Sequence, residues 1–241
     1  MLLDGSPRKQ SLAFRTITKV IRFLTTALCR FDDDELIKVP RKGPLLLVTN
    51  HINILDIPII YTRMNTQWLT AFVKIESWSD PIQRGLLNLW EGIPLIRGEA
   101  DMAAFRKALA MLEKGYIVAV APEGTRNHHG RLLKGLPGVA LLAVQSGVPI
   151  LPLAYHGLES FWHNLPRLRK TPFNVRIGKP FVLNSGGDRV NRAIRRKMID
   201  EVMYQLAELL PPQNRGVYSD LSKASQKYLD FVEIDPDNYP D

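Results

Sequence analysis

Residues 43–56 read GPLLLVTNHINILD, in which an apolar run ends at a cluster of polar side chains. The run 45–49 lacks the alternation of a half-exposed strand, so we expect a strand that is covered on both faces. Five further apolar runs follow along the chain, at residues 68–73, 93–96, 117–121, 150–154 and 174–177. Helical stretches separate several of these runs, which is the rhythm of βαβ units. The sequence therefore predicts a single α/β domain whose mostly parallel central sheet is flanked by helices.

Two long helices are marked by the residues at their ends. Residues 101–114 open at Asp101 and close at Gly115, which suits a helix start and stop. Residues 189–210 form the last long helix, and the double proline that follows ends it. The chain from residue 211 onward carries six acidic and three basic side chains, and we expect it to be a peripheral acidic tail.

The N-terminal segment 12–30 has the pattern of an amphipathic helix. Its apolar residues recur at spacings of three and four, at Phe14, Ile17, Ile21, Leu24 and Leu28. Its basic flank consists of Arg15, Lys19, Arg22 and Arg30. Two interpretations are open: a helix that lies in a membrane interface, and a helix that packs on the domain core. A membrane span is excluded, because each of the basic residues is costly at mid-bilayer.

The charge of the chain indicates an anionic partner. The formal net charge is +8 at neutral pH, and residues 163–197 carry ten basic side chains against one acid. Nucleic acid, anionic lipid headgroups and phosphorylated small molecules all satisfy such a charge. The stretch HNLPRLRKTPFNVRIGK at 163–179 holds one aromatic, Phe173, whereas a nucleic-acid surface needs aromatic side chains interleaved with basic ones. We therefore expect no nucleic-acid partner.

Cysteine usage and the apolar pattern favour the cytoplasm. Cys29 is the single cysteine, so an intramolecular disulfide framework is excluded, and no cysteine pair suggests a zinc site. The N-terminus MLLDGSPRKQ lacks the apolar core of a secretory signal. The longest uncharged stretch, residues 135–158, is interrupted by glycine and proline, so we expect no transmembrane helix.

His51 and Asp56 form the first candidate pair for catalysis. Histidine acts as a base near neutral pH, and a carboxylate on its second ring nitrogen fixes the tautomer and stabilises the imidazolium. On one uninterrupted helix, a separation of five would place the two side chains about 140° apart. Pro58 belongs in the first turn of a helix, so the helix should begin near Asp56 and leave His51 on a loop that folds back. The alternative is that Asp56 is an N-cap and His51 an incidental loop residue.

Two further segments place an arginine after a predicted strand. Residues 121–126 read APEGTR, in which glycine permits a tight loop and Arg126 can bind an oxyanion in bidentate fashion. An acid beside an arginine is equally typical of a loop salt bridge. Residues 92–98 read GIPLIRG and end a strand with Arg97. Together with the His51 segment, both lie at carboxyl ends of predicted strands, where open α/β sheets bind ligands, and this coincidence favours a site.

Taken together, these segments resemble the sequence blocks of the glycerolipid acyltransferases, the 1-acylglycerol-3-phosphate acyltransferase family. NHINILD resembles the NHxxxxD block, GIPLIRG the second block, PEGTR the third, and VPILPLA at 148–154 the fourth. Their order and spacing also match, over roughly residues 40–185. The resemblance implies an acyltransferase that moves a fatty acyl group from an acyl thioester to the free hydroxyl of 1-acyl-sn-glycerol 3-phosphate. The product would be phosphatidic acid, in phospholipid biosynthesis.

The resemblance also implies roles for individual residues. His51 is then the general base, and Asp56 is its partner. The glycerol phosphate of the acceptor would be bound by residues of the second and third blocks, namely Arg97, Glu123, Gly124, Thr125 and Arg126. Two further phosphate candidates, Lys74 and Lys134, match basic positions often found in the family. Pro152 matches the fourth-block proline, with a structural role.

Some residues depart from the family pattern or fall outside it. Pro94 and Leu95 stand where other apolar or aromatic residues are common in the second block, which leaves acceptor choice open. His128 and His129 follow the third block without a role that the resemblance assigns. We expect them on a solvated loop, since two adjacent histidines bind a metal only with a third ligand. The prediction is no metal, and no cofactor beyond an acyl-ACP or acyl-CoA co-substrate.

The predicted chemical step is direct transfer. His51 removes the proton from the acceptor hydroxyl as the oxygen attacks the thioester carbonyl. Cys29 lies far from the blocks in the sequence, and no serine stands in a G-x-S-x-G elbow, so we expect no acyl-enzyme. Alternatives are an acyltransferase for glycerol 3-phosphate or another lysolipid, a thioesterase that admits water, and a non-enzymatic module that binds anionic surfaces.

These expectations divide the chain into three parts. Residues 1–42 form an amphipathic membrane-interface segment, residues 43–210 the acyltransferase domain, and residues 211–241 the peripheral tail. Anionic membrane surfaces attract basic segments by ~1 kcal/mol per basic residue. We therefore expect a peripheral protein on the cytoplasmic face of an anionic membrane, where its lysophospholipid acceptor resides.

Overall fold

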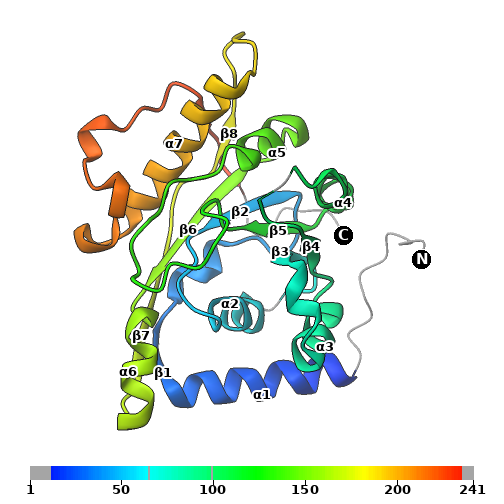
Figure 1. Ribbon diagram of the computed structural model, residues 1–241, viewed down its shortest axis with the longest axis vertical. Helices are drawn as coiled ribbons and strands as arrows, with labels where there is room; N and C mark the ends of the chain where they lie inside the picture. Colours follow the sequence, from blue (N-terminus) through cyan, green and yellow to red (C-terminus); the bar gives the residue numbers. More distant parts are fainter. Residues whose placement is uncertain (1–11, 65, 99, 235–241) are drawn as a thin grey trace.

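The computed structural model describes residues 12–64, 66–98 and 100–234. Within them, nine strands form one sheet (Figure 1). Its main path consists, in spatial order, of β1 (Cys29–Asp32), β7 (Thr171–Ile177), β6 (Ile150–His156), β2 (Leu45–Thr49), β5 (Ile117–Val120), β3 (Leu69–Lys74) and β4 (Ile93–Leu95). Two short strands extend the sheet from β6, namely β8 (Phe181–Leu183) and β9 (Leu229–Phe231).

Most of the pairing in this sheet is parallel. β2 pairs in parallel with β5 and β6, β3 with β4 and β5, and β1 with β7. β6 runs antiparallel to β7 and β8, and β8 runs antiparallel to β9. The expected class, one α/β domain with a mostly parallel sheet, is confirmed.

The two faces of the sheet carry separate hydrophobic cores. Along β2 the side chains alternate between them, so that Leu45 and Leu47 belong to one core and Leu46 and Val48 to the other. All four are at most 1% exposed, which explains why the run shows no apolar–polar alternation in the sequence. A continuous apolar strand is therefore the mark of the central position of β2.

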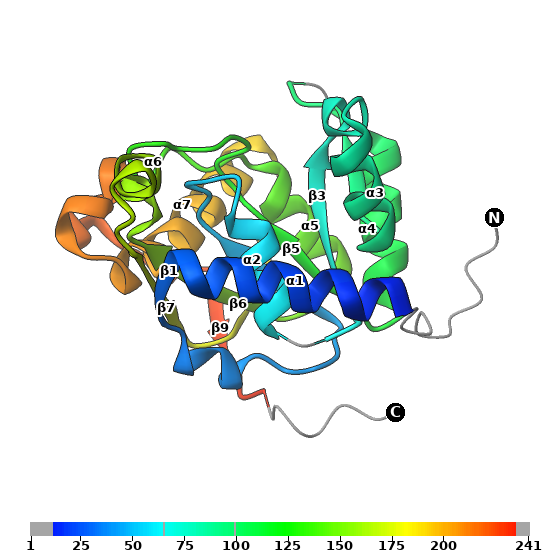
Figure 2. The ribbon, with the colours of Figure 1, turned by 90° about the horizontal axis from the view of Figure 1, so that it is seen from below.

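Helices cover both faces (Figures 1 and 2). The core that contains Leu45 receives side chains from α1 (Leu12–Leu28), α2 (Asp56–Met64), α3 (Pro81–Leu89) and α6 (Phe161–Asn164). The opposite core receives them from α4 (Met102–Glu113), α5 (Gly138–Ser146) and α7 (Arg192–Leu209). The two long helices expected from the sequence are α4 and α7. Each is capped by a side chain, since Asp101 accepts from the amides of Ala103 and Ala104, and Asn191 accepts from the amide of Ile194.

Helix α1 serves the core on one side and exposes apolar residues on the other. Phe14 and Ile21 pack against the core that contains Leu45, as one of the two interpretations of this segment expected. Leu24, which belongs to the same predicted stripe, is 52% exposed, and Phe23 is 73% exposed. The helix ends at Leu28 instead of residue 30, because the chain from Cys29 pairs with β7. In the described part of the chain, no helix has the length and apolar character that a membrane crossing requires.

The expectation of a peripheral tail from residue 211 is wrong for the residues that the structure describes. β9 pairs with β8 in the main sheet, and Tyr218, Tyr228 and Leu229 are buried in the core beside α7. The amide of Tyr228 donates to the buried carboxylate of Glu201 at 2.9 Å. The acidic composition was misleading because these few buried aromatic and apolar residues alternate with exposed charges. Residues 235–241 of the predicted tail, and residues 1–11 of the predicted interface segment, lie outside the described residues.

Candidate active site

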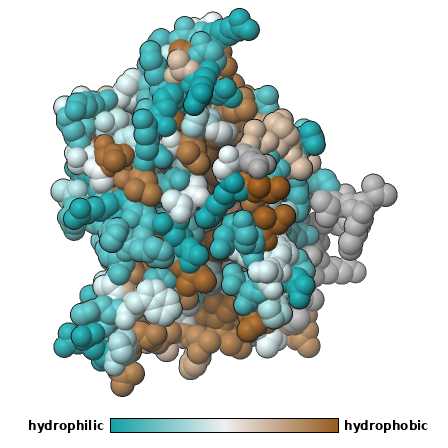
Figure 3. All heavy atoms as spheres, viewed as in Figure 1, coloured by the Kyte–Doolittle hydropathy of each residue, from teal (hydrophilic) through white to brown (hydrophobic). Residues whose placement is uncertain are grey.

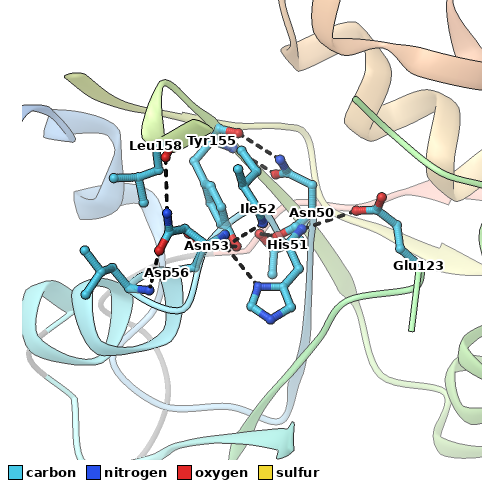
Figure 4. Close-up of polar contacts among 10 residues, drawn as sticks. Asn50, His51, Ile52, Asn53, Asp56, Glu123, Tyr155 and Leu158 are labelled. Carbon is cyan, nitrogen blue, oxygen red and sulfur yellow. Dashed lines mark hydrogen bonds and ion pairs between the residues drawn. The ribbon is translucent and has the colours of Figure 1, made fainter. Parts of the chain in front are cut away.

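The loop after β2 brings His51 and Asp56 together. α2 begins at Asp56, as the position of Pro58 predicted. The preceding loop folds back on itself, with the amide of Asp56 donating to the carbonyl of Asn53 at 3.3 Å. His51 Nδ1 then lies 2.9 Å from Asp56 Oδ2 (Figure 4). The spacing of five thus forms a contact through a loop, which one continuous helix would not allow.

The carboxylate of Asp56 is buried and accepts several hydrogen bonds. Its side chain is 1% exposed. Besides the histidine, Oδ2 accepts from the amides of Ile52 at 2.6 Å and Asn53 at 2.9 Å, and from the hydroxyl of Tyr155 at 2.9 Å. The two amides precede Asp56 in the chain, so the carboxylate orders the loop and does not cap the first turn of α2. The alternative of a simple N-cap is therefore wrong.

Tyr155 and Asn50 are site residues that the sequence did not reveal. Burial and the neighbouring Asp56 carboxylate raise the pKa of Tyr155 well above its ordinary value, so its hydroxyl stays a donor. Asn50 clamps the same strand, because its Nδ2 donates to the Tyr155 carbonyl at 2.8 Å and its Oδ1 accepts from the Tyr155 amide at 3.0 Å. Tyr155 follows directly on VPILPLA, and Asn50 precedes the histidine, but neither position alone signals a contact between them.

The third-block loop holds the main chain of His51 from the other side. The His51 amide donates to Glu123 Oε1 at 3.2 Å, and the His51 carbonyl accepts from the amide of Asn127 at 2.7 Å. Figure 4 shows His51 between Asp56 and Glu123. Both polar groups of the His51 backbone are thus bonded to one loop. This fixes the position of the residue independently of the contact at its ring.

The buried carboxylate of Glu123 links the His51 loop to the chain at Leu133. It is 6% exposed, and its second oxygen, Oε2, accepts from the amide of Leu133 at 2.8 Å. Burial raises the pKa of this carboxyl to about 7, although the amides of Leu133 and His51 act in the opposite direction. Both oxygens are therefore engaged with main-chain groups. This arrangement differs from the direct acceptor contact that the resemblance implied for Glu123.

The turn at Gly124 requires glycine. Its φ is +68°, and its amide donates to the carbonyl of Ala121 at 3.0 Å, which closes a tight turn. A Cβ at this position would lie 2.5 Å from Leu136 Cδ1. Thr125, the next residue, is exposed. The tight loop expected from the sequence is confirmed, and it presents the threonine hydroxyl outward.

Two arginines lie near each other at the same edge of the sheet. Arg97 follows β4, and Arg126 belongs to the loop after β5. Partial removal from water and the like charge of Arg126 lower the pKa of the Arg97 guanidinium. Over the described residues, neither arginine forms an ion pair, so the alternative of a Glu123–Arg126 salt bridge is not realised. Two neighbouring cations of this kind favour an anion between them.

The two lysine candidates are placed less closely. Lys74 is half-buried at the end of β3, and Lys134 is exposed on the loop that follows Leu133. Lys134 is tied to the site indirectly, because the amide of Leu133 binds Glu123.

The remaining candidate residues show neither a metal site nor a reactive nucleophile among the described residues. His128 and His129 are exposed, as expected for a solvated loop. A search of the described residues finds no group of three or more His, Cys, Asp or Glu side chains that could hold a metal ion. Cys29 is buried in β1, and burial raises the pKa of its thiol to about 11. A thiol with this pKa is a poor nucleophile at neutral pH.

A mostly parallel α/β sheet that carries a His–Asp pair and two arginines at the carboxyl ends of its strands fits the class of enzymes that activate a nucleophile next to an anionic group. The family follows from comparison with known proteins. Residues 30–156, more than half of the chain, match the family model described as Acyltransferase. The chain belongs to the Acyltransferase family, and the family expected from the sequence is confirmed.

Named relatives agree with this assignment. The chain is 28% identical over 138 residues to the human 1-acyl-sn-glycerol-3-phosphate acyltransferase beta, a match that covers 56% of this chain and 49% of the relative. It is 29% identical over 187 residues to the 1-acyl-sn-glycerol-3-phosphate acyltransferase of Pseudomonas aeruginosa, covering 69% and 70%. The chain thus spans about half the length of several curated relatives that it matches.

A solved structure shows the same fold. It is the 1-acyl-sn-glycerophosphate (LPA) acyltransferase, PlsC, from Thermotoga maritima, at 25% identity and a TM-score of 0.58. The similarity covers 78% of this chain and 75% of that chain.

Proposed function

We propose that this protein transfers a fatty acyl chain from an acyl thioester to the free hydroxyl of 1-acyl-sn-glycerol 3-phosphate, which yields phosphatidic acid. The observation that carries the proposal is the contact between His51 Nδ1 and Asp56 Oδ2, 2.9 Å long, in a loop whose backbone is fixed on both sides. The names of the relatives support the choice of acceptor.

The geometry of the pair suits a general base. With Nδ1 bonded to Asp56, the proton-accepting nitrogen of His51 is Nε2. The acceptor hydroxyl gives its proton to Nε2 while its oxygen attacks the thioester carbonyl. The tetrahedral intermediate then collapses, the carbon–sulfur bond breaks, and the departing thiolate takes the proton from His51. The histidine returns to its starting state, and the products are an ester and a free thiol.

The charge near the pair suits a phosphorylated acceptor. Arg97 and Arg126 provide two guanidinium groups that no ion pair neutralises in the described chain. A phosphate between them would relieve their mutual repulsion and would form charge-assisted hydrogen bonds. Gly124 closes the tight turn that separates the buried Glu123 from the exposed Thr125 and the half-buried Arg126. Lys74 and Lys134 remain further candidates for the phosphate.

The proposed location is the cytoplasmic face of an anionic membrane, to which the protein binds peripherally. Support comes from the apolar residues that α1 exposes, Val20, Phe23 and Leu24, beside its basic side chains. Replacing Phe23, which is 73% exposed, by serine should weaken sedimentation with anionic vesicles without lowering the melting temperature. Deleting the helix is a poorer test, because Phe14 and Ile21 pack on the core.

The experiment that tests the reaction is an incubation of the pure protein with a panel of lysolipids, glycerol 3-phosphate and both donors, acyl-ACP and acyl-CoA, with product masses as the readout. We expect phosphatidic acid from lysophosphatidic acid as the main product. A different acylated product would change the acceptor, and free fatty acid alone would indicate a thioesterase. No acyl turnover with any pair, from folded protein, would contradict the proposal.

A further inference from the structure

The connection between β6 and β7 ends in an exposed leucine with an unusual backbone. α6 is followed by a short 3-10 helix, η4 (Leu165–Arg167), and the chain then reverses at Leu168. Leu168 has φ 52° and ψ 30°, in the left-handed region, and its side chain is 95% exposed. A residue in this conformation at a helix end is usually glycine.

The stability of the fold gives no reason for a leucine at this position. In the left-handed conformation a Cβ crowds the following carbonyl, so any residue with a side chain is disfavoured there relative to glycine. Exposure gives no compensation, because an apolar side chain that stays in water gains nothing from burial. In the isolated protein the leucine therefore carries a backbone cost that no burial offsets. A contact outside the protein would explain why it stands there.

The surroundings of Leu168 match one kind of partner. Its neighbours in the chain are three basic residues, Arg167, Arg169 and Lys170, all exposed. Trp162, on α6, is 60% exposed. An exposed leucine with three cations beside it in the chain fits an anionic lipid surface, where leucine enters the apolar layer, tryptophan lies at the headgroup level and cations contact the phosphates.

The same end of the molecule carries the exposed part of α1. Lys170 Nζ donates to the carbonyl of Thr26 at 3.3 Å, and Leu28 and Leu168 line one shallow hollow together with Phe161. Figures 1 and 2 show α6 beside the C-terminal end of α1. In Figure 3 apolar residues gather along the lower edge of the molecule, where these elements lie. The two elements therefore present their apolar residues to one side.

We propose that residues 162–170, the α6 tip, form an insertion point that enters the interface of an anionic bilayer, with Leu168 and Trp162 as its apolar contacts. This proposal rests on the proposed function only because a lysolipid acceptor resides in a membrane. It adds a second contact to the one proposed for α1. The segment just before the α6 tip is bonded to the active site, since Asn53 Nδ2, in the His51 loop, donates at 3.2 Å to the carbonyl of Leu158, four residues before Trp162. Membrane contact at the α6 tip would thus hold the His51 loop at a set position relative to the bilayer.

The test uses Leu168→Gly in the full chain. Glycine relieves the left-handed backbone, so the melting temperature should stay equal or rise. Sedimentation with phosphatidylcholine vesicles that contain phosphatidylglycerol should weaken by about tenfold, the scale expected for one leucine that is no longer buried. Leu168→Phe, which keeps an apolar side chain, should retain binding. Val217→Asn is the matched control, because Val217 is 63% exposed on the C-terminal segment, orange in Figure 1 and away from the α6 end.

Each other outcome has a defined meaning. Three results would overturn the α6 tip proposal. They are unchanged vesicle binding of Leu168→Gly, an equal loss of binding in Val217→Asn, and wild-type binding that does not depend on phosphatidylglycerol. A large fall in the melting temperature of Leu168→Gly would also contradict it, because Leu168 would then serve the fold. Turnover of a short-chain, water-soluble lysolipid should be equal in wild type and Leu168→Gly. Absence of that turnover in wild type would count against the proposed function and leave the binding result standing.

Discussion

The two sides of the active site are built on different principles. On the side of His51, the backbone N–H and C=O are both bonded, and Asp56 Oδ2 accepts from four donors while buried at 1% exposure. On the side of Arg97 and Arg126, neither guanidinium forms an ion pair among the described residues, and the charge of Glu76 acts on Arg97 only as a weaker opposing influence on its pKa. We therefore expect the groups proposed for proton transfer to be in position before substrate arrives. We expect the charge of a bound ligand to complete the arginine side.

The largest loss of turnover is expected when the hydrogen bonds on the side of His51, here called the rigid side, are removed. Asp56→Asn replaces an acceptor of four hydrogen bonds by an amide and removes the charge that selects the tautomer of His51. We expect kcat to fall on the order of 10³- to 10⁴-fold. Asp34→Asn, at an exposed residue of the 3-10 helix Asp34–Lys38, is the matched control and should behave as wild type. Steady-state kinetics give the answer, and an Asp56→Asn enzyme within tenfold of wild type would refute the rigid-side account.

On the side of Arg97 and Arg126, substitutions should weaken binding of the acceptor. Arg126→Ala and Arg97→Ala each remove a charge-assisted contact to phosphate, which costs about 1.5 to 3 kcal/mol, or roughly 10- to 150-fold in kcat/KM for the acceptor. The KM for the acyl donor should change little. Arg131→Ala, at an exposed residue of the same connection, is the control. Equal effects on both substrates would place the arginines in donor binding or structure instead.

Tyr155→Phe should have a smaller effect of a distinct kind. The ring keeps its packing, with its centroid 5.3 Å from that of Phe173, but Asp56 loses one of its donors. A hydrogen bond to a charged group is worth about 1.5 kcal/mol, so kcat should fall by about tenfold with both KM values unchanged. Tyr204→Phe, at a half-buried tyrosine on α7, serves as the control. A change confined to KM would show that the hydroxyl acts on substrate binding.

The smallest effect on turnover, a few-fold, is expected for Glu123→Gln, whose main signature is the pH dependence of stability. The pKa of Glu123 rises from 4.5 to about 7 on burial, so between these values the folded protein binds more protons than the unfolded one. This contribution to stability is fully present below pH 4.5 and is lost as the pH rises through 7. Glutamine removes it. Melting temperatures from pH 4 to 8 should therefore decline less in the variant, and parallel curves would contradict the assignment.

Much of the structure on the side of His51 could be predicted from the sequence, because the residues that produce it lie within one short segment. The apolar run of β2 and the proline at 58 act within one segment, so they predicted the start of α2. They also allowed a contact between His51 and Asp56, which the resemblance of this segment to the NHxxxxD block then favoured. Tyr155 could not be found in this way. It is separated from Asp56 by 99 residues and reaches it because β6 pairs with β2, which no local pattern reports.

The hydrogen bonds of Glu123 were not predicted, for a related reason. The resemblance placed it with the acceptor, but its oxygens bind the amides of His51 and Leu133. The short strands β1, β8 and β9 and the buried residues after 211 were also not predicted. Three or four residues at a sheet edge give too little periodicity, and their order depends on partners already in place.

The most direct test of the central claim is a single-turnover measurement with His51→Ala and wild type, each saturated with acyl donor and lysophosphatidic acid. Phosphatidic acid formation and acceptor affinity are measured on the same samples. If His51 is the base held by Asp56, the variant binds the acceptor as wild type does and forms phosphatidic acid at least about 10³-fold more slowly. Phosphatidic acid formed by the variant at a rate near that of wild type would contradict the account.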